Sequence, residues 1–268
     1  MIRREVPLTD EPANWLLISQ VEHARISGEL AAAWRAAPSP PAVRNELLAA
    51  STHHDDGWAA AEAHPPLDPA QGRPYSFLDL PRDDSLVLWR DSILIARRIG
   101  PLAGWSVAGH FVRLLVDSEH AKRETSRAWL TEVSRWRQSW LNEWTAIDRS
   151  INTVRLAGEC LESVRLFDWL SLWLCCQCPA RPDDDAIAPA MSVDGLGSAP
   201  VRFESESDQA KGEPRTVLVS PWPFVGPKVD VDALGYAVPV QEYATSEELA
   251  KRRSPLRLRW RLVEGFSR

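Results

Sequence analysis

Two histidines and two aspartates stand side by side in the segment His53-His54-Asp55-Asp56. Imidazole nitrogens and carboxylate oxygens together suit divalent ions such as Mn, Fe, Zn or Ni better than a site made only of thiolates would. Successive residues of a helix point about 100° apart, so we do not expect His54 and Asp55 to hold one ion as an i,i+4 pair does. We expect them to offer an imidazole to one ion and a carboxylate that bridges to a second.

A further candidate is Asp168, which lies in the most apolar stretch of the chain, among leucine, phenylalanine and tryptophan residues at positions 166–173. An ionised carboxylate in such surroundings is costly unless it is paired, hydrogen-bonded or bound to a cation. We therefore interpret Asp168 as a metal ligand. The alternative is a structural aspartate that pairs with an arginine such as Arg165.

The residues from His54 to Gly57 resemble the His-Asp-x-Gly signature of the HD-domain metal-dependent hydrolases. In that superfamily one histidine lies on an earlier helix, the His-Asp pair on the next helix and a last aspartate on a late helix. The resemblance covers about residues 15–175 and implies an HD-like helical bundle. It also implies a primary metal ion held by His23, His54, Asp55 and Asp168.

One position departs from this pattern. Trp58 replaces the lysine that commonly follows the glycine in the signalling branch of the superfamily, and the further motifs of that branch are missing. The sequence therefore does not favour cleavage of cyclic dinucleotides. We interpret Trp58 as a core residue, with an aromatic wall for a planar substrate as the alternative.

The chain is also similar to an uncharacterised bacterial family that is catalogued only as a domain of unknown function. The similarity implies no activity. It rests on four segments: Gln-x-x-His-Ala around His23, His-Asp-Asp-Gly-Trp at 54–58, Gly-His-Phe around His110 and Phe-Asp-Trp-Leu-Ser-Leu around Asp168.

The remaining histidines fall on different kinds of segment. His110 lies on an apolar stretch, and we interpret it as a ligand of a second ion or a phosphate contact, with a buried core histidine as the alternative. His53 is expected to orient a ligand or line the cleft, and Asp56 or His53 to transfer protons. His64, in a proline-rich loop, and His120, at the start of a charged helix, are expected at the surface.

Together these residues predict a metal-dependent hydrolase that cuts a phosphoester or related bond in a small molecule. One or two divalent ions, of Mn, Fe, Zn or Ni, would lower the pKa of bound water and polarise the scissile group. Two other functions stay open. One is a module that binds a ligand or partner without catalysis. The other is an oxygenase with two irons, held by His23, His54, His110 and one of His53 or His64.

The composition sets the frame for this interpretation. The chain has 268 residues, 44% hydrophobic and 25% charged, and a formal net charge of −6, which is typical of a globular protein and argues against a dedicated nucleic-acid binder. No apolar segment reaches the ~20 residues of a membrane span, and no secretory signal is recognised. The cysteines crowd into residues 160–178, which favours reduced thiols in the cytoplasm. Cys175 and Cys178 are interpreted as buried small residues rather than a redox or zinc pair.

The pattern of apolar residues predicts the elements that would position the site. We expect a proline-rich loop over 64–81 and strands at 217–219, 236–240 and 256–263, with 2–6 as a further candidate. The expected fold is mainly α: an HD-like helical domain over 1–178, a linker or loop over 179–200, and a small β-rich appendage over 201–268 packed on the bundle. Helices are expected over 15–34, 40–58, 86–99, 105–116, 119–144 and 151–176.

Overall fold

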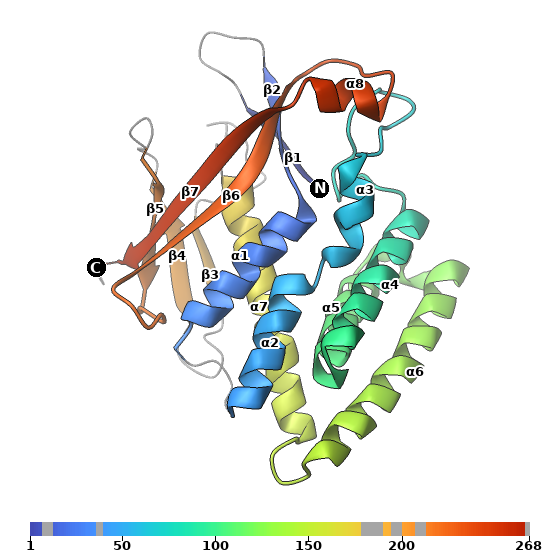
Figure 1. The fold of residues 1–268 in the computed structure, drawn as a ribbon, viewed down its shortest axis with the longest axis vertical. Coiled ribbons are helices and arrows are strands. Elements are labelled where there is room, and N and C mark those ends of the chain that lie inside the picture. The colour runs from blue at the N-terminus through green and yellow to red at the C-terminus, as the bar shows by residue number, and fades with distance from the viewer. Residues whose placement is uncertain (7–12, 36–39, 178–189, 194–199, 207–212, 266–268) are drawn as a thin grey trace.

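The structure is a computed structural model, and it describes residues 1–6, 13–35, 40–177, 190–193, 200–206 and 213–265. Its strands form one mixed sheet, and its long helices extend away from that sheet as a bundle (Figure 1). Within the described part of the chain, no helix combines the length and the apolar composition that crossing a membrane requires.

The sheet takes strands from both ends of the chain. Within the described residues it has seven strands in the order β1-β2-β6-β7-β5-β4-β3. Neighbouring strands are antiparallel except β5 and β7, which run parallel. The strands are β1 Ile2–Val6, β2 Asn14–Ile18, β3 Ala190–Val193, β4 Val201–Ser205, β5 Arg215–Ser220, β6 Lys228–Pro239 and β7 Ser254–Glu264.

The helices follow most of the predicted windows. A 24-residue helix, α7, replaces the window 151–176, and the window 119–144 divides into a short 3-10 turn, η2, and a long helix, α6. The elements are α1 Gln20–Ala33, α2 Pro41–His53, η1 Asp56–Trp58, α3 Ala59–Ala63, α4 Arg82–Ile99, α5 Pro101–Val116, η2 Glu119–Lys122, α6 Glu124–Ile147, α7 Val154–Gln177 and α8 Ser246–Lys251.

The prediction of a mainly α protein with a small β-rich C-terminal appendage is wrong. The sheet is a major part of the molecule, and β1 and β2 bring the N-terminal residues into it beside β6. The largest error concerns residues 15–18, which were expected to begin a helix and instead form β2. The helix α1 begins only at Gln20, after Ser19, whose hydroxyl accepts the backbone N–H of Glu22 at 3.0 Å.

The burial of β2 on both faces explains this error. Leu16 and Ile18 pack into the core between the sheet and the helices, whereas Trp15 and Leu17 pack into a small core on the opposite face, with Val238 and residues near α8. A strand that is buried on both faces has no alternation of apolar and polar residues, so periodicity cannot distinguish it from a buried helix. One of its pairing partners, β6, lies more than 200 residues later in the chain.

Two larger cores hold the sheet and the bundle together. In the first, Ile26 and Leu30 of α1 and Phe167 and Leu170 of α7 pack against buried residues of the sheet such as Trp260. The second core lies among α2, α4, α5, α6 and α7. The helices α1 and α7 therefore stand between the sheet and the rest of the bundle. The boundary between the predicted domains stays a prediction, because residues 179–189 and 194–199 of the expected linker lie outside the described residues, while residues 190–193 form β3.

A close approach of α1 and α2 brings two of the predicted ligands together. A Cβ at Gly28 would lie 1.9 Å from Oγ1 of Thr52, so only glycine permits this distance between the helices. His23 lies on α1 and His54 directly follows α2, and their ring centroids are 5.1 Å apart.

Candidate metal centre

His23 reaches the site from the first half of α1, and its orientation is set by a serine of α7. The hydroxyl of Ser171 donates to the carbonyl oxygen of Asp168 at 2.8 Å, so its oxygen is free to accept from Nδ1–H of His23, at 2.9 Å. With the ring proton on Nδ1, the lone pair of Nε2 is available to a metal ion, and Nε2 lies 2.9 Å from Oδ2 of Asp55. A histidine that ligates a metal is commonly oriented in this way through its other nitrogen.

His54 and Asp55 enter the same site from the end of α2. Nδ1–H of His54 donates to the carbonyl oxygen of Ser51 at 2.8 Å, which directs Nε2 towards Oδ1 of Asp168 at 3.0 Å. The chain leaves the helix here, because Asp55 has φ −113° and ψ 16°. Its carboxylate consequently turns back, and Oδ2 lies 3.5 Å from Nε2 of His54. Both side chains therefore point to one place, although successive residues of a continuous helix would point about 100° apart.

Asp168 supplies the fourth side chain from the middle of α7. Besides its contact with His54, its Oδ1 lies 3.8 Å from Nε2 of His23. Asp168 does not form the alternative ion pair with Arg165. Nη1 of Arg165 instead lies 2.7 Å from Oε2 of Glu162. In the ion pairs of the Asp168 carboxylate within the described residues, every partner is a histidine.

The four side chains meet the spatial requirement of a metal site. One ligand atom from each of His23, His54, Asp55 and Asp168 lies within 4.8 Å of all the others. Ligands at bond lengths of about 2.0–2.2 Å from one ion are separated by about 3–4.4 Å, which is close to the contacts above. Two imidazoles and two carboxylates are a donor set for a divalent transition ion, so the residues present fit a metal, whose identity the geometry does not select.

The charges of the cluster shift the pKa values of His54 and Asp168. Burial lowers the pKa of His54, but the charge of Asp55 and the hydrogen bond to Asp168 outweigh it and raise that pKa to about 9. Burial raises the pKa of Asp168, but the neighbouring His110 and His54 outweigh it and hold the pKa well below its usual range. Without a metal ion, protonated histidine therefore supplies positive charge that stabilises the Asp168 carboxylate.

His110 lies beside this group on α5. Its ring centroid is 5.7 Å from that of His54, and its Nε2 is 3.7 Å from Oδ2 of Asp168. Burial lowers its pKa, against the opposing charge of Asp168. His110 is therefore a buried imidazole at the edge of the cluster, and its Nδ1 has no hydrogen-bond partner within the described residues.

The other predicted site residues lie outside the cluster. Nδ1 of His53 and Oδ2 of Asp56 pair with each other at 2.8 Å, with the side chain of His53 46% exposed. His64 directly follows α3 and is exposed. His120 lies in η2, where its Nε2 is 3.6 Å from Oε1 of Glu119. Of the predicted C-x-x-C pair, Cys175 is buried in the core against the sheet, and Cys178 lies outside the described residues.

Sequence reasoning missed the residues that support the ligands. Ser51 and Ser171 bind the second nitrogens of the two histidines, and the hydroxyl of Ser92 accepts the backbone N–H of Gly57 at 3.1 Å. Ser171 could have been found from the sequence, because it follows Asp168 by three residues and so lies on the same side of the helix. For Ser51 and Ser92 the sequence carries no comparable signal, because Ser51 acts through its backbone carbonyl oxygen, which every residue has, and Ser92 binds a backbone N–H.

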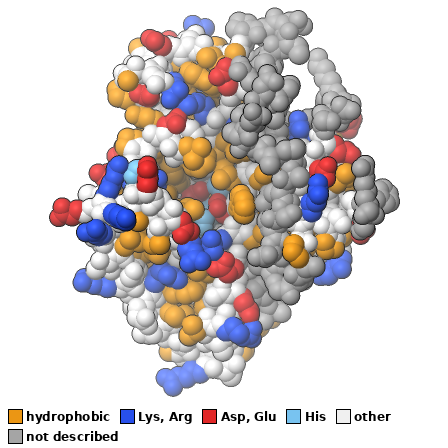
Figure 2. All heavy atoms as spheres, turned by 180° about the vertical axis from the view of Figure 1, so that it is seen from behind, with side chains coloured by type: hydrophobic (Ala, Val, Ile, Leu, Met, Phe, Trp, Pro, Cys, Tyr) orange, Lys and Arg blue, Asp and Glu red, His pale blue; other side chains and the backbone are white. Residues whose placement is uncertain are grey.

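The cluster is buried but has one side towards solvent. The side chain of Asp168 is 15% exposed, compared with 2% for His23, 0% for His54 and 7% for Asp55. The neighbouring Trp169 is 55% exposed. The face shown in Figure 2 is hollowed near its centre, and acidic and histidine side chains lie at the bottom of the hollow. A substrate would therefore approach along the Asp168 side of the cluster.

Comparisons with known proteins give a family but no activity. The model of a family described as protein of unknown function (DUF3891) matches residues 2–240, a range that contains every ligand of the cluster. Neither a curated protein nor a solved structure shows a significant match to the chain.

Proposed function

The chain belongs to the DUF3891 family of proteins of unknown function, and from its site we propose that it is a metal-dependent hydrolase acting on a phosphoester or related bond of a small molecule. The observation that carries the proposal is the buried group His23, His54, Asp55 and Asp168, whose ligand atoms converge within 4.8 Å. A Mn, Fe, Zn or Ni ion suits this donor set.

The order of the ligands along the chain supports a hydrolytic site. A histidine, then a His-Asp pair, then a late aspartate is also the order found in the HD-domain metal-dependent hydrolases. The structure places these residues on α1, after α2 and on α7. This agreement supports a relationship with that superfamily through the site.

Each side chain would have a defined task. His23 and His54 present Nε2 because Nδ1 is already bonded to Ser171 and Ser51, and Asp55 and Asp168 supply the negative charge that balances a divalent ion. An ion held there would lower the pKa of water and polarise the bond to be cut. Next to Asp168, His110 would offer a buried imidazole to a substrate oxygen or a second ion.

Metal analysis and hydrolysis assays on four proteins test this proposal. The proteins are the wild type, His54→Ala, Asp168→Ala and, as a matched control, His120→Ala, which removes a histidine far from the cluster. We expect metal in the wild type and the control, with both cluster variants depleted, and hydrolysis of p-nitrophenyl phosphate or bis(p-nitrophenyl) phosphate that follows metal content. Equal metal content in all four proteins would rule out the site. Metal that depends on the cluster without turnover of either ester would rule out the phosphoesterase.

The oxygenase with two irons is the second candidate, and His110 is the observation that favours it, as a third imidazole beside the cluster. The fourth histidine that it would need is not supplied by His53, which pairs with Asp56, nor by the exposed His64. Oxygen consumption that depends on iron content would support the oxygenase, whereas hydrolysis by iron-free protein would exclude it.

A further inference from the structure

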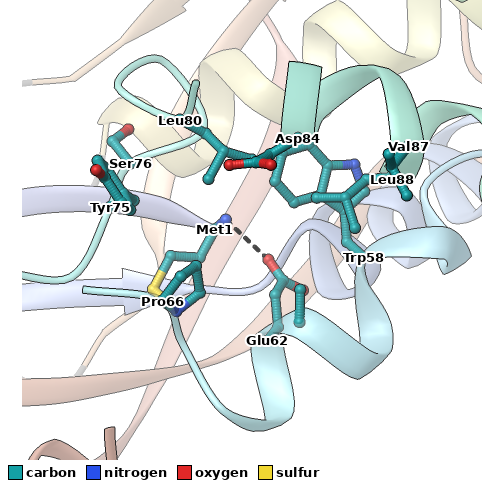
Figure 3. A pocket seen from close by; sticks show the side chains of 11 residues that line it. Met1, Trp58, Glu62, Pro66, Tyr75, Ser76, Leu80, Asp84, Val87 and Leu88 are labelled. Atoms are coloured by element: carbon teal, nitrogen blue, oxygen red, sulfur yellow. Dashed lines mark ion pairs between the residues drawn. The ribbon is translucent and has the colours of Figure 1, made fainter. Parts of the chain in front are cut away.

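A cavity of about 280 Å³ lies outside the metal cluster, at the junction of α3, the start of α4 and the first residue of the chain (Figure 3). Its walls are mostly apolar, with side chains of Trp58, Pro66, Leu80, Val87 and Leu88. A cavity of this kind receives the hydrocarbon part of a ligand. The cavity also contains two carboxylates, which indicate the charge of that ligand.

The first carboxylate, Glu62, is buried and incompletely paired. Its Oε1 accepts the backbone N–H of Gln20 at 2.7 Å and lies 2.9 Å from the ammonium group of Met1. Its Oε2 is buried and has no hydrogen-bond partner within the described residues. Burying a carboxylate oxygen without a donor is costly, so this atom favours a ligand that brings an N–H group.

The second carboxylate, Asp84, lies in the first turn of α4. It lines the cavity together with Trp58 (Figure 3). Its side chain has no ion-pair partner in the described part of the chain. Because the Met1 ammonium is paired with Glu62, Asp84 leaves the cavity with an excess of negative charge.

We propose that this cavity is a binding site for an organic ammonium ion with an apolar body. The ammonium group offers three N–H donors to the two carboxylates, and the face of an indole adds attraction for a cation. The alkyl or aryl body packs against Leu80, Leu88 and the proline. An anionic ligand is disfavoured by the same carboxylates.

The cavity adjoins the metal cluster through Trp58. The backbone N–H of Trp58 donates to the carbonyl oxygen of Asp55 at 3.0 Å, so a ligand against the indole lies next to the turn that carries a metal ligand. Ammonium binding nevertheless uses none of the cluster residues. The proposal therefore stands apart from the proposed hydrolase activity.

Calorimetric titration of the full chain tests the proposal, with 2-phenylethylammonium as probe and 2-phenylethanol as its uncharged analogue. We expect saturable binding of the ammonium to one site and about fivefold weaker binding of the alcohol, because a charge-assisted hydrogen bond is lost. Asp84→Asn, at an exposed position, should weaken ammonium binding by about the same factor. The matched control is Asp91→Asn, an exposed aspartate of the same helix that does not line the cavity, and it should leave the affinity unchanged.

A variant that fills the cavity distinguishes binding in the cavity from binding at other acidic surfaces. Ala61 lines the cavity, and Ala61→Phe should abolish binding of both probes while a thermal melt shows that the protein is folded. Equal affinity for the ammonium and the alcohol would contradict recognition of charge. An unchanged affinity in Asp84→Asn, or binding that persists in Ala61→Phe, would place the ammonium elsewhere and overturn the proposal.

Discussion

His54 and Asp168 lie 114 residues apart in the chain, and their side chains meet through a 3.0 Å hydrogen bond between Nε2 and Oδ1. The bond joins the end of α2 to the middle of α7. Nδ1 of His54 is held in turn by the carbonyl oxygen of Ser51. The ring is therefore fixed at both nitrogens before any ion arrives, which is how a preorganised ligand reduces the cost of binding.

Metal removal should destabilise the protein. An ion that binds only the folded state adds about 2.7 kcal/mol to the free energy of unfolding when its concentration is 100 times its Kd. We expect a chelator to lower the Tm of the wild type and added metal to restore it, as followed by circular dichroism. Asp168→Asn should show much smaller shifts, because it removes one of the two negative charges that the cluster offers to the ion. A full metal-induced shift in Asp168→Asn would contradict this role for Asp168.

Ser171 should act on the metal through His23. Ser171→Ala removes the oxygen that accepts Nδ1–H of His23 at 2.9 Å, and loss of such an orienting group typically weakens metal binding about 10- to 100-fold. Ser163→Ala is the matched control, since Ser163 lies on the same helix, is also buried and bonds only to the backbone of Glu159. Competition with a fluorescent chelator measures both affinities. Equal loss in the two variants would indicate a general effect on α7.

The stability of the metal-free protein should depend on pH through His54. Its pKa rises from 6.5 to about 9 on folding, so the folded state binds the proton more tightly than the unfolded state does. The resulting stabilisation is complete below pH 6.5 and is lost as the pH rises to about 9. Urea unfolding in the presence of a chelator should show this fall, and His54→Gln should reduce it.

The affinity for metal, in contrast to the stability of the metal-free protein, should increase with pH through His54. An ion must displace the proton from Nε2 of His54, so the affinity for metal should rise between pH 6.5 and about 9. The rise approaches about tenfold per pH unit for one displaced proton. Titrations at constant ionic strength measure it. An affinity that does not change with pH across this window would mean that His54 does not ligate the ion.

The sequence predicted most of the helices and the four residues of the candidate metal cluster, but not the sheet as a whole. The ligands could be found because each is a rare polar residue in a distinct setting, such as Asp168 among large apolar side chains. The strand β2 could not, because both of its faces are buried and its partners β1 and β6 are set by tertiary structure. The convergence of His54 and Asp55 followed only from the resemblance to the HD-domain hydrolases, because it requires α2 to end at His53, which helical periodicity did not indicate.

The cavity beside Trp58 shows a similar limit. Glu62 and Asp84 look like ordinary surface acids in the sequence, because nothing local indicates that α3 and α4 enclose a space. Trp58 was interpreted as a core residue, and it is indeed buried in the core of the bundle. The same side chain lines the cavity. A residue with both roles is recognised only when its neighbours from distant segments are known.

The glycine of the His-Asp-Asp-Gly segment leads to the last prediction. A Cβ at Gly57 would lie 2.3 Å from the carbonyl oxygen of Leu88 and 2.4 Å from the backbone nitrogen of Ser92, so Gly57→Ala must push η1 away from α4. Overpacking of this kind costs about 1–3 kcal/mol. Because Asp55 precedes this turn, metal affinity should fall together with the free energy of unfolding.

Gly158→Ala provides the matched control. A Cβ at Gly158 would have nothing within 4 Å, and the residue lies inside α7, where alanine is favoured over glycine by about 0.8–1.0 kcal/mol. This variant should therefore be more stable than the wild type in urea and should bind metal with the same affinity. If Gly57→Ala matched Gly158→Ala in both measurements, the contact of η1 with α4 would not be what holds Asp55 in place.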